Sequence, residues 1–323
     1  MVLGTGGTIA GTASSASDNL GYTAAQVGIA QLLEALPGVS QVLAGRALLA
    51  EQVAQIDSKD MSFAVWQALA QRVSFHLSQP DVKGVVITHG TDTLEETAYF
   101  LHVVLPAAHC AGKPVVLTCA MRPASSAAPD GPQNLLDALA LAATTGACGV
   151  LAVCAGMVHG AVAVQKVHPY RLDAFNSGES GAVACVEEGR VRLLREWPVH
   201  AQHATPDMLE KVCRARPWPR VEIVMNYAGA GAAMVDALVA QSSAAQQGAT
   251  PLQGLVVAAT GNGTVHQELE AALLRAQAAG VKVVVASRCC SGRVLARSEA
   301  LFPDSEGLSP VKARIALMLA LMA

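Results

Sequence analysis

Short apolar segments rich in β-branched residues alternate with helix-forming segments along nearly the whole chain, and this alternation restricts the fold more than any other feature. It is typical of parallel strands joined by helical crossovers. The expected strands occupy residues 2–3, 48–53, 84–88, 114–118, 150–154, 221–225, 254–258 and 281–286. The expected helices occupy residues 26–36, 61–77, 93–105, 131–144, 266–279 and 309–321. The pattern therefore predicts an α/β protein.

The alternation fades between residues 196 and 220, a polar segment that holds several prolines and two of the three tryptophans. We interpret this segment as a linker. It separates a larger N-terminal α/β domain, residues 1–195, from a smaller C-terminal α/β domain, residues 221–323. We expect a mixed, mostly parallel sheet flanked by helices in the first and a parallel sheet in the second. His200 and His203 lie in the linker, but no Cys or acidic residue is spaced as a further ligand, so we expect no metal site there.

The charge balance excludes some classes of partner. Only 15% of the residues are charged, the formal net charge is -3, and no basic stripe is present. We therefore expect neither nucleic acid nor a membrane as a partner. The longest segment without Asp, Glu, Lys or Arg, residues 138–165, is broken by glycines and threonines and does not have the pattern of a membrane span.

The N-terminal residues and the pattern of cysteines indicate the cellular compartment in which we expect the protein. The chain begins with three apolar residues and then glycines, without a basic segment before them. We expect a cytoplasmic protein, or a periplasmic one if a signal peptide has been removed. None of the eight cysteines forms a CxxC pair and most lie inside apolar segments, so we expect buried thiols in a reducing compartment.

Two loops carry polar residues where predicted strands end, which is where open α/β sheets bind ligands. The first, GTGGTIAGT, spans residues 4–12. It lacks the last Gly or Ala of a dinucleotide fingerprint and the lysine of a P-loop, so it is not expected to bind phosphate. What remains is a glycine-hinged turn that presents the hydroxyls of Thr5 and Thr8, or a tight turn with capping threonines.

The second loop is THGTDT, residues 88–93. We expect Thr93 to be the N-cap of the next helix and Glu96 to complete a capping box. Helix capping does not require Thr91 or Asp92, so these two residues are candidates for a functional role. A threonine hydroxyl is a poor nucleophile until a base takes its proton, and Asp92 is a weak base because a helix N-terminus stabilises its anion.

Lys166 is a candidate for the missing base. It follows a predicted strand and a loop, and Val164 and Val167 beside it could desolvate its amine. The alternative is a lysine that extends its ammonium to the surface. In IDSKDMS, residues 56–62, Asp57 or Ser58 can cap the next helix, which is the simplest interpretation of both.

Together these motifs resemble the bacterial-type L-asparaginase family, which includes the glutaminase-asparaginases. The resemblance covers nearly the whole chain. GTGGTIAGT is similar to the family's first threonine signature and GVVITHGTDTLEETAYF to its second, in the same order. The segments CAMRPASSAAPDGPQNL, VEIVMNYAG and ATGNGTV are also similar to segments of the family.

The resemblance implies roles for five side chains of the N-terminal domain. Thr8 resembles the family's primary nucleophile. Thr91, Asp92 and Lys166 resemble a second triad that polarises Thr91 or an intervening water. Tyr22 resembles the tyrosine of a flexible lid that closes over the site and helps activate the first threonine.

It also implies substrate contacts. Ser58 and Asp92 resemble the residues that hold the α-carboxylate and α-amino groups of the substrate. Lys59 stands where the family often has Gln, and its ammonium could pair with the α-carboxylate or point to solvent. Gly11 and Gly21 are plausible hinges of the lid.

In the C-terminal domain, Asn262 resembles an asparagine that the family places at a subunit interface. An acidic residue from a neighbouring subunit is expected at the substrate's amino group, and Glu299 is the leading candidate, with Asp304 and Glu306 as alternatives. The resemblance thus implies a homotetramer whose sites are completed across a dimer interface, with no metal and no cofactor.

The implied activity is hydrolysis of L-asparagine to L-aspartate and ammonia through a threonine acyl-enzyme. A glutaminase-asparaginase of broader amide specificity is the nearest alternative, because Lys59 departs from the family pattern. A non-catalytic amino-acid-binding protein on the same scaffold would be expected to lack part of the catalytic set, whereas Thr8, Thr91, Asp92 and Lys166 are all present.

Overall fold

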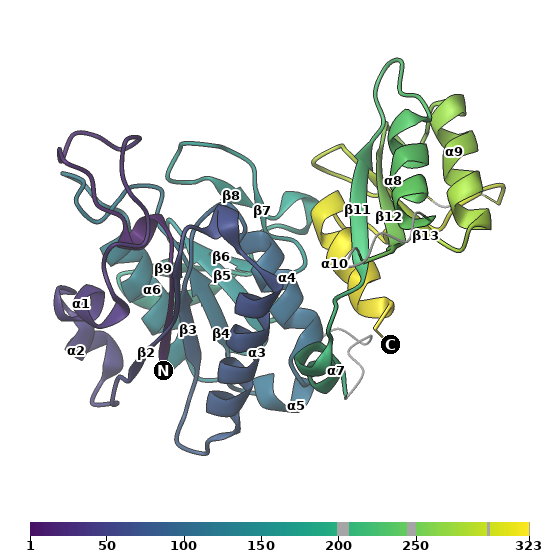
Figure 1. Cartoon of the computed structure of the whole chain (residues 1–323). Helices are drawn as coiled ribbons and strands as arrows, with labels where there is room; N and C mark the ends of the chain where they lie inside the picture. The colour runs from purple at the N-terminus through teal and green to yellow at the C-terminus, as the bar shows by residue number, and fades with distance from the viewer. Residues whose placement is uncertain (199–206, 244–249, 296–297, 323) are drawn as a thin grey trace. The chain divides into compact units, whose positions relative to one another are not determined.

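An eight-stranded sheet forms the centre of the first of two structural units, Met1–Leu209 and Glu210–Ala323. Figure 1 shows the chain as a computed structural model, which describes residues 1–198, 207–243, 250–295 and 298–322. The division between the units falls inside the segment expected to be a linker. That segment contains a helix, α7 (Met208–Arg214), which its sequence pattern did not reveal. His200 and His203 lie outside the described residues.

The sheet of the first unit is mixed and mostly parallel, as predicted. Its strand order is β10-β9-β6-β5-β4-β3-β1-β2. The strands from β2 to β5 run parallel, and β6, β9 and β10 each pair antiparallel with their neighbours. Their bounds are β1 Val2–Gly6, β2 Ala50–Ile56, β3 Val85–Thr88, β4 Val115–Thr118, β5 Val150–Cys154, β6 Met157–Gly160, β9 Ala184–Glu187 and β10 Arg190–Leu193. A separate two-stranded sheet pairs β7 (Gln165–Lys166) with β8 (Phe175–Asn176).

Helices cover both faces of this sheet (Figure 1). One group contains α1, α2 and α6, and the other contains α3, α4 and α5. Their bounds are α1 Ile29–Glu34, α2 Val39–Leu43, α3 Phe63–Ser78, α4 Leu94–Val104, α5 Ala107–Cys110 and α6 Gly131–Ala143. The central strands are apolar on both faces because helices bury both, which explains their continuous runs of Val, Ile and Leu.

Strand register decides which side chains meet each group of helices. Val2, Val86, Val116 and Leu151 are in register across four parallel strands and therefore share one face. They pack in one cluster with residues of α1 and α6. Burying one such aliphatic side chain stabilises the fold by about 1.5–3 kcal/mol.

The second unit is a three-stranded parallel sheet, also as predicted, with the order β11-β12-β13. The strands are β11 Arg220–Met225, β12 Leu252–Ala259 and β13 Lys282–Ser287. Its helices are α8 Ala233–Ser243, α9 Gln267–Ala278 and α10 Pro310–Ala320. Leu255 and Val257 of β12 are fully buried in a core that includes Leu269 and Leu273 of α9.

The cap of α4 differs from its prediction in its hydrogen bond. Thr93 does occupy the N-cap position of α4, but its hydroxyl makes no cap bond and instead donates to the carbonyl oxygen of Ser58, 2.8 Å away. The capping box with Glu96 is therefore wrong. Ser309 is the N-cap residue of α10 and Pro310 opens the helix, without a side-chain cap bond. Asp57 caps a 3₁₀ helix at Ser58–Asp60, and the following α3 is capped by Ser62.

All eight cysteines are free thiols. Cys110, Cys119, Cys154 and Cys185 are buried, whereas the neighbours Cys289 and Cys290 are exposed. The expectation of buried thiols thus holds for four of them. Within the described ranges, no helix combines the length and the apolar character needed to cross a membrane.

The loops that follow β1 and β3 touch at two glycines. Gly7 has φ +83°, and a Cβ on it would lie 2.4 Å from both the Cα and the nitrogen of Gly90. A Cβ on Gly90 would lie 2.4 Å from the Oγ of Ser58, which follows β2. Three loops from adjoining strands therefore meet where only hydrogen atoms fit, and this contact sets the positions of the residues that follow.

We predict that Gly7→Ala destabilises the protein more than Gly45→Ala. Gly45 has the same φ of +83° but open space around its Cα. Alanine at Gly45 should therefore cost only the left-handed conformation, about 1–2 kcal/mol. At Gly7 the backbone of two loops must also shift, which should add about 1–3 kcal/mol. Urea unfolding of both variants measures the difference, and equal losses would contradict the close approach of the loops.

Candidate active site

Thr8 lies at the carboxyl end of β1, in a 3₁₀ helix at Thr8–Ala10. Its side chain is largely buried, and its Oγ1 lies 2.7 Å from the hydroxyl oxygen of Tyr22. The structure therefore brings together the two residues that were expected to act as a pair. Thr5 does not share this role. It is buried, and its hydroxyl donates to the carbonyl oxygen of Thr88, 2.8 Å away, so the expectation that the turn presents Thr5 is wrong.

The segment that carries Tyr22 is docked onto the rest of the unit. Thr12 and Thr23 exchange two backbone hydrogen bonds, which close the segment into a loop. The Ala13 N–H donates to the Ser125 hydroxyl at 2.7 Å. Gly11 has φ -88°, which any residue adopts, but a Cβ there would lie 2.9 Å from the Tyr22 ring. Glycine at position 11 thus lets the tyrosine approach the chain closely.

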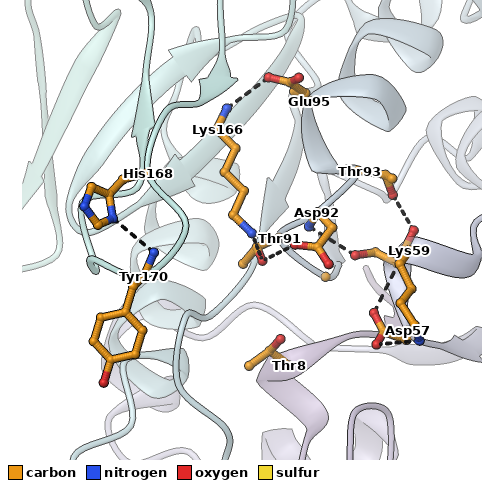
Figure 2. A network of polar contacts seen from close by, with 12 residues as sticks. Thr8, Asp57, Lys59, Thr91, Asp92, Thr93, Glu95, Lys166, His168 and Tyr170 are labelled. Carbon is orange, nitrogen blue, oxygen red and sulfur yellow. Dashed lines mark hydrogen bonds and ion pairs between the residues drawn. The ribbon is translucent and has the colours of Figure 1, made fainter. Parts of the chain in front are cut away.

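Thr91, Asp92 and Lys166 form a second group (Figure 2). The Lys166 ammonium donates to the Thr91 Oγ1 at 2.8 Å and to the Asp92 Oδ1 at 2.6 Å. The Thr91 hydroxyl lies 3.4 Å from the same Asp92 oxygen. Thr91 and Asp92 come from the loop after β3, and Lys166 comes from β7. The Lys166 side chain is 19% exposed and the Asp92 side chain 52%, so the ion pair faces solvent on the carboxylate side.

Ser58 connects the loop after β2 to this group. Its Oγ accepts the backbone N–H of Asp92 at 3.2 Å, and the residue is buried. Lys59 points elsewhere. Its ammonium is bonded to Asp57 at 3.1 Å and to Asp60 at 3.0 Å, and its side chain is 62% exposed. Of its two expected orientations, the structure shows the one directed to the surface.

His89 is fully buried beneath the site, and its partners fix its tautomer. Its Nδ1–H donates to the carbonyl oxygen of Gly90 at 2.7 Å, so its Nε2 accepts the Thr97 hydroxyl at 2.9 Å. The Trp66 indole N–H donates in turn to the Thr97 oxygen at 2.9 Å. Burial lowers the pKa of His89 from 6.5 to about 4, which keeps it neutral. The histidine thereby links the loop after β3 to α3 and α4.

Thr8 and Thr91 thus each follow one of two glycines in contact, and the hydroxyl of each has a hydrogen-bond partner of its own. Thr8 has a phenol, and Thr91 has a lysine with a carboxylate. Such pairs suit covalent acyl transfer. Among the described residues, no group of three or more His, Cys, Asp or Glu side chains is placed to hold a metal ion.

Comparisons with known proteins identify the family. The model of the family described as asparaginase, N-terminal, matches residues 1–199, and that of the glutaminase/asparaginase C-terminal domain matches residues 220–323. The chain belongs to the asparaginase family. It is 34% identical to L-asparaginase 2 of Bacillus subtilis (strain 168) over 99% of this chain and 81% of that protein. It is 36% identical to the glutaminase-asparaginase of Pseudomonas fluorescens biotype A over 99% of this chain and 85% of that protein.

A solved structure confirms the fold of this asparaginase-family chain. The probable cytoplasmic L-asparaginase from Campylobacter jejuni superposes with a TM-score of 0.87 and 34% identity, covering 99% of this chain and 94% of that one.

The remaining candidates lie in the second unit. The side-chain amide of Asn262 makes two hydrogen bonds to the backbone of Leu295. Its Oδ1 accepts the Leu295 N–H at 2.6 Å, and its Nδ2 donates to the Leu295 carbonyl oxygen at 3.3 Å. Asn262, Glu299 and Asp304 line a pocket of about 490 Å³. The Asp304 carboxylate accepts the backbone N–H of Glu306 at 2.7 Å, so it has a local structural role.

Two residues near the site had no assigned role from sequence. His89 stood in the second motif without a function, and nothing in the sequence indicates its bond to Thr97 or the bond of Thr97 to Trp66. Glu95 accepts the backbone N–H of Lys166 at 2.9 Å. No local sequence pattern indicates this bond, which spans 71 positions.

We predict that His89 makes stability depend on pH. Its pKa is about 6.5 in the unfolded chain and about 4 when folded. Stability is therefore full above pH 6.5 and is lost as the pH falls towards 4, by about 1.4 kcal/mol per pH unit. His89→Gln should remove this contribution, so its free energy of unfolding should fall less steeply across the interval. Urea unfolding at several pH values measures both slopes, and identical slopes would show that His89 is not held neutral.

Proposed function

We propose that the protein hydrolyses L-asparagine to L-aspartate and ammonia through an acyl-enzyme ester on Thr8. The observation that carries the proposal is the pairing of two buried threonine hydroxyls, each with its activating partner, in a chain of the asparaginase family. The relatives named L-asparaginase, including that of Bacillus subtilis, support asparagine as the substrate. The reaction needs no metal and no cofactor.

The first step is acylation. The Thr8 oxygen attacks the side-chain amide carbon of the substrate. The Thr8 O–H donates a hydrogen bond to the Tyr22 hydroxyl oxygen at this stage. Backbone N–H groups at the loop ends stabilise the oxyanion. The C–N bond breaks, net transfer of the threonine proton to the leaving nitrogen gives ammonia, and the ester remains on Thr8.

The second step is hydrolysis of the ester. Thr91, polarised by Lys166 and Asp92, orients a water towards the ester carbon. The water oxygen bonds to the ester carbon, the bond from that carbon to the Thr8 Oγ1 breaks, Thr8 takes a proton from the water, and aspartate leaves. Lys166 holds the proton-transfer path in place because its ammonium touches both the Thr91 hydroxyl and the Asp92 carboxylate.

Substrate contacts follow from the same loops. We propose that Ser58 and Asp92 hold the α-carboxylate and α-amino groups, since both lie beside Thr91. We leave Lys59 out of this set, because two carboxylates already neutralise its exposed ammonium.

We further propose that a homotetramer completes each site, with Asn262 and Glu299 supplied by a neighbouring subunit. The support is that both line one pocket of the second unit, while the Asp304 carboxylate is bonded to the backbone of Glu306. We place the protein in the cytoplasm, like the Campylobacter jejuni relative by its name, although a Haemophilus influenzae relative is named as periplasmic.

A glutaminase-asparaginase is the second candidate, because proteins with that name match this chain at 36% and 33% identity. Ammonia release from asparagine and from glutamine separates the two functions. The proposal expects kcat/KM on asparagine to exceed that on glutamine by at least about tenfold, which equals 1.4 kcal/mol of transition-state discrimination. Comparable values on both amides would support the second candidate, and no ammonia from either would overturn both.

We predict that Thr8→Ala and Thr91→Val each lower kcat by at least about a thousandfold, as loss of a nucleophile or its activating group does. Both variants should stay folded. Thr5→Val is the matched control, since its hydroxyl bonds to Thr88 rather than to the site. It should retain its turnover at some loss of stability. Steady-state ammonia release measures all three, and near-normal turnover in Thr8→Ala or Thr91→Val would remove that threonine from the mechanism.

A further inference from the structure

Lys166 lies on β7, a strand that is not part of the eight-stranded sheet. Within the described part of the chain, β7 pairs with β8 in its own two-stranded sheet, through the residue pairs Gln165–Asn176 and Lys166–Phe175. The ammonium of Lys166 sits at the end of a flexible four-carbon side chain. Its contact with Thr91 therefore depends on what fixes the Lys166 backbone.

Glu95 provides such a contact. Its Oε2 accepts the backbone N–H of Lys166 at 2.9 Å, a bond that spans 71 positions of sequence. Figure 2 shows this bond at the opposite end of Lys166 from Thr91 and Asp92. Lys166 is thus held at two points, its backbone by Glu95 and its ammonium by the threonine and the aspartate.

One continuous segment, the loop after β3 and the start of α4, supplies both points. Glu95 lies in the first turn of α4, the helix that begins directly after the loop with Thr91 and Asp92. A bond from a peptide N–H to a carboxylate is charge-assisted and stronger than one to a neutral acceptor. The carboxylate is also favoured in the first turn of a helix. Because Glu95 bonds to the backbone, it acts on the position of the lysine rather than on its proton.

We propose that Glu95 is a positioning residue, which holds the Lys166 backbone at the distance from which the ammonium reaches Thr91 and Asp92. The inference rests on the proposed amide hydrolysis for its kinetic consequence. The anchoring itself does not depend on which substrate is turned over.

The kinetic test uses two substitutions of one residue. Glu95→Ala removes the acceptor and should lower kcat on asparagine at least about tenfold while KM stays within about twofold, because the substrate contacts remain. Glu95→Gln keeps an oxygen acceptor without the charge and should restore most of the turnover. Glu96→Ala removes a carboxylate from the same first turn and is the matched control, with kcat expected near that of the wild type.

The second readout needs no activity. Hydrogen–deuterium exchange of the peptide that contains Lys166 should be faster in Glu95→Ala than in the wild type, and near the wild-type rate in Glu95→Gln. Unchanged exchange in Glu95→Ala would overturn the proposal, as would equal kinetic losses in the Ala and Gln variants. If the wild type releases no ammonia, the proposed function fails, while the exchange experiment still decides whether Glu95 anchors Lys166.

Discussion

The site depends on one close approach between backbones, that of Gly7 to Gly90, with Ser58 packed against the second glycine. Parallel neighbours β2, β1 and β3 end at the same edge of the sheet, so their loops leave side by side. Because the glycines carry no Cβ, the two loops can approach closely, and the residue after each glycine lies beside the other loop. Those residues are Thr8 and Thr91. The order of the strands thus places both hydroxyls, and the missing side chains let them come close.

The two threonines then sit in different electrostatic surroundings. Thr8 contacts the phenol of Tyr22 on a docked loop, and Thr91 contacts an ion pair. Two side chains of the same type can take different chemical roles when their surroundings differ in this way. Tyr22 and Lys166 both arrive from segments outside the main parallel strands, so their positions depend on side-chain and loop contacts. Ser125 holds the loop that carries Tyr22, and Glu95 holds the strand that carries Lys166.

The fold could be predicted, and so could the grouping of Thr8 with Tyr22 and of Lys166 with Thr91, for reasons visible in particular residues. Buried parallel strands such as β3 and β5 are continuous apolar runs, and their prediction missed by at most one residue. The short strands β7 and β8 escaped because two residues carry no periodic pattern. The Thr93 cap failed because a neighbouring carbonyl, that of Ser58, competes for its hydroxyl. Lys166, the partner of Glu95, lies 71 positions away, where local patterns give no signal. Thr97 is only eight residues after His89, but a buried bond between two side chains leaves no periodic pattern.

Formation of the ester on Thr8 is the central claim, and acid-quenched peptide mapping tests it most directly. Enzyme mixed with asparagine is quenched within milliseconds and digested, and the peptides carrying Thr8 and Thr91 are weighed by mass spectrometry. The account predicts an added aspartyl group on the peptide with Thr8, absent in Thr8→Ala. An acyl group on the peptide with Thr91 instead, or ammonia release with no acyl group on either peptide, would contradict it.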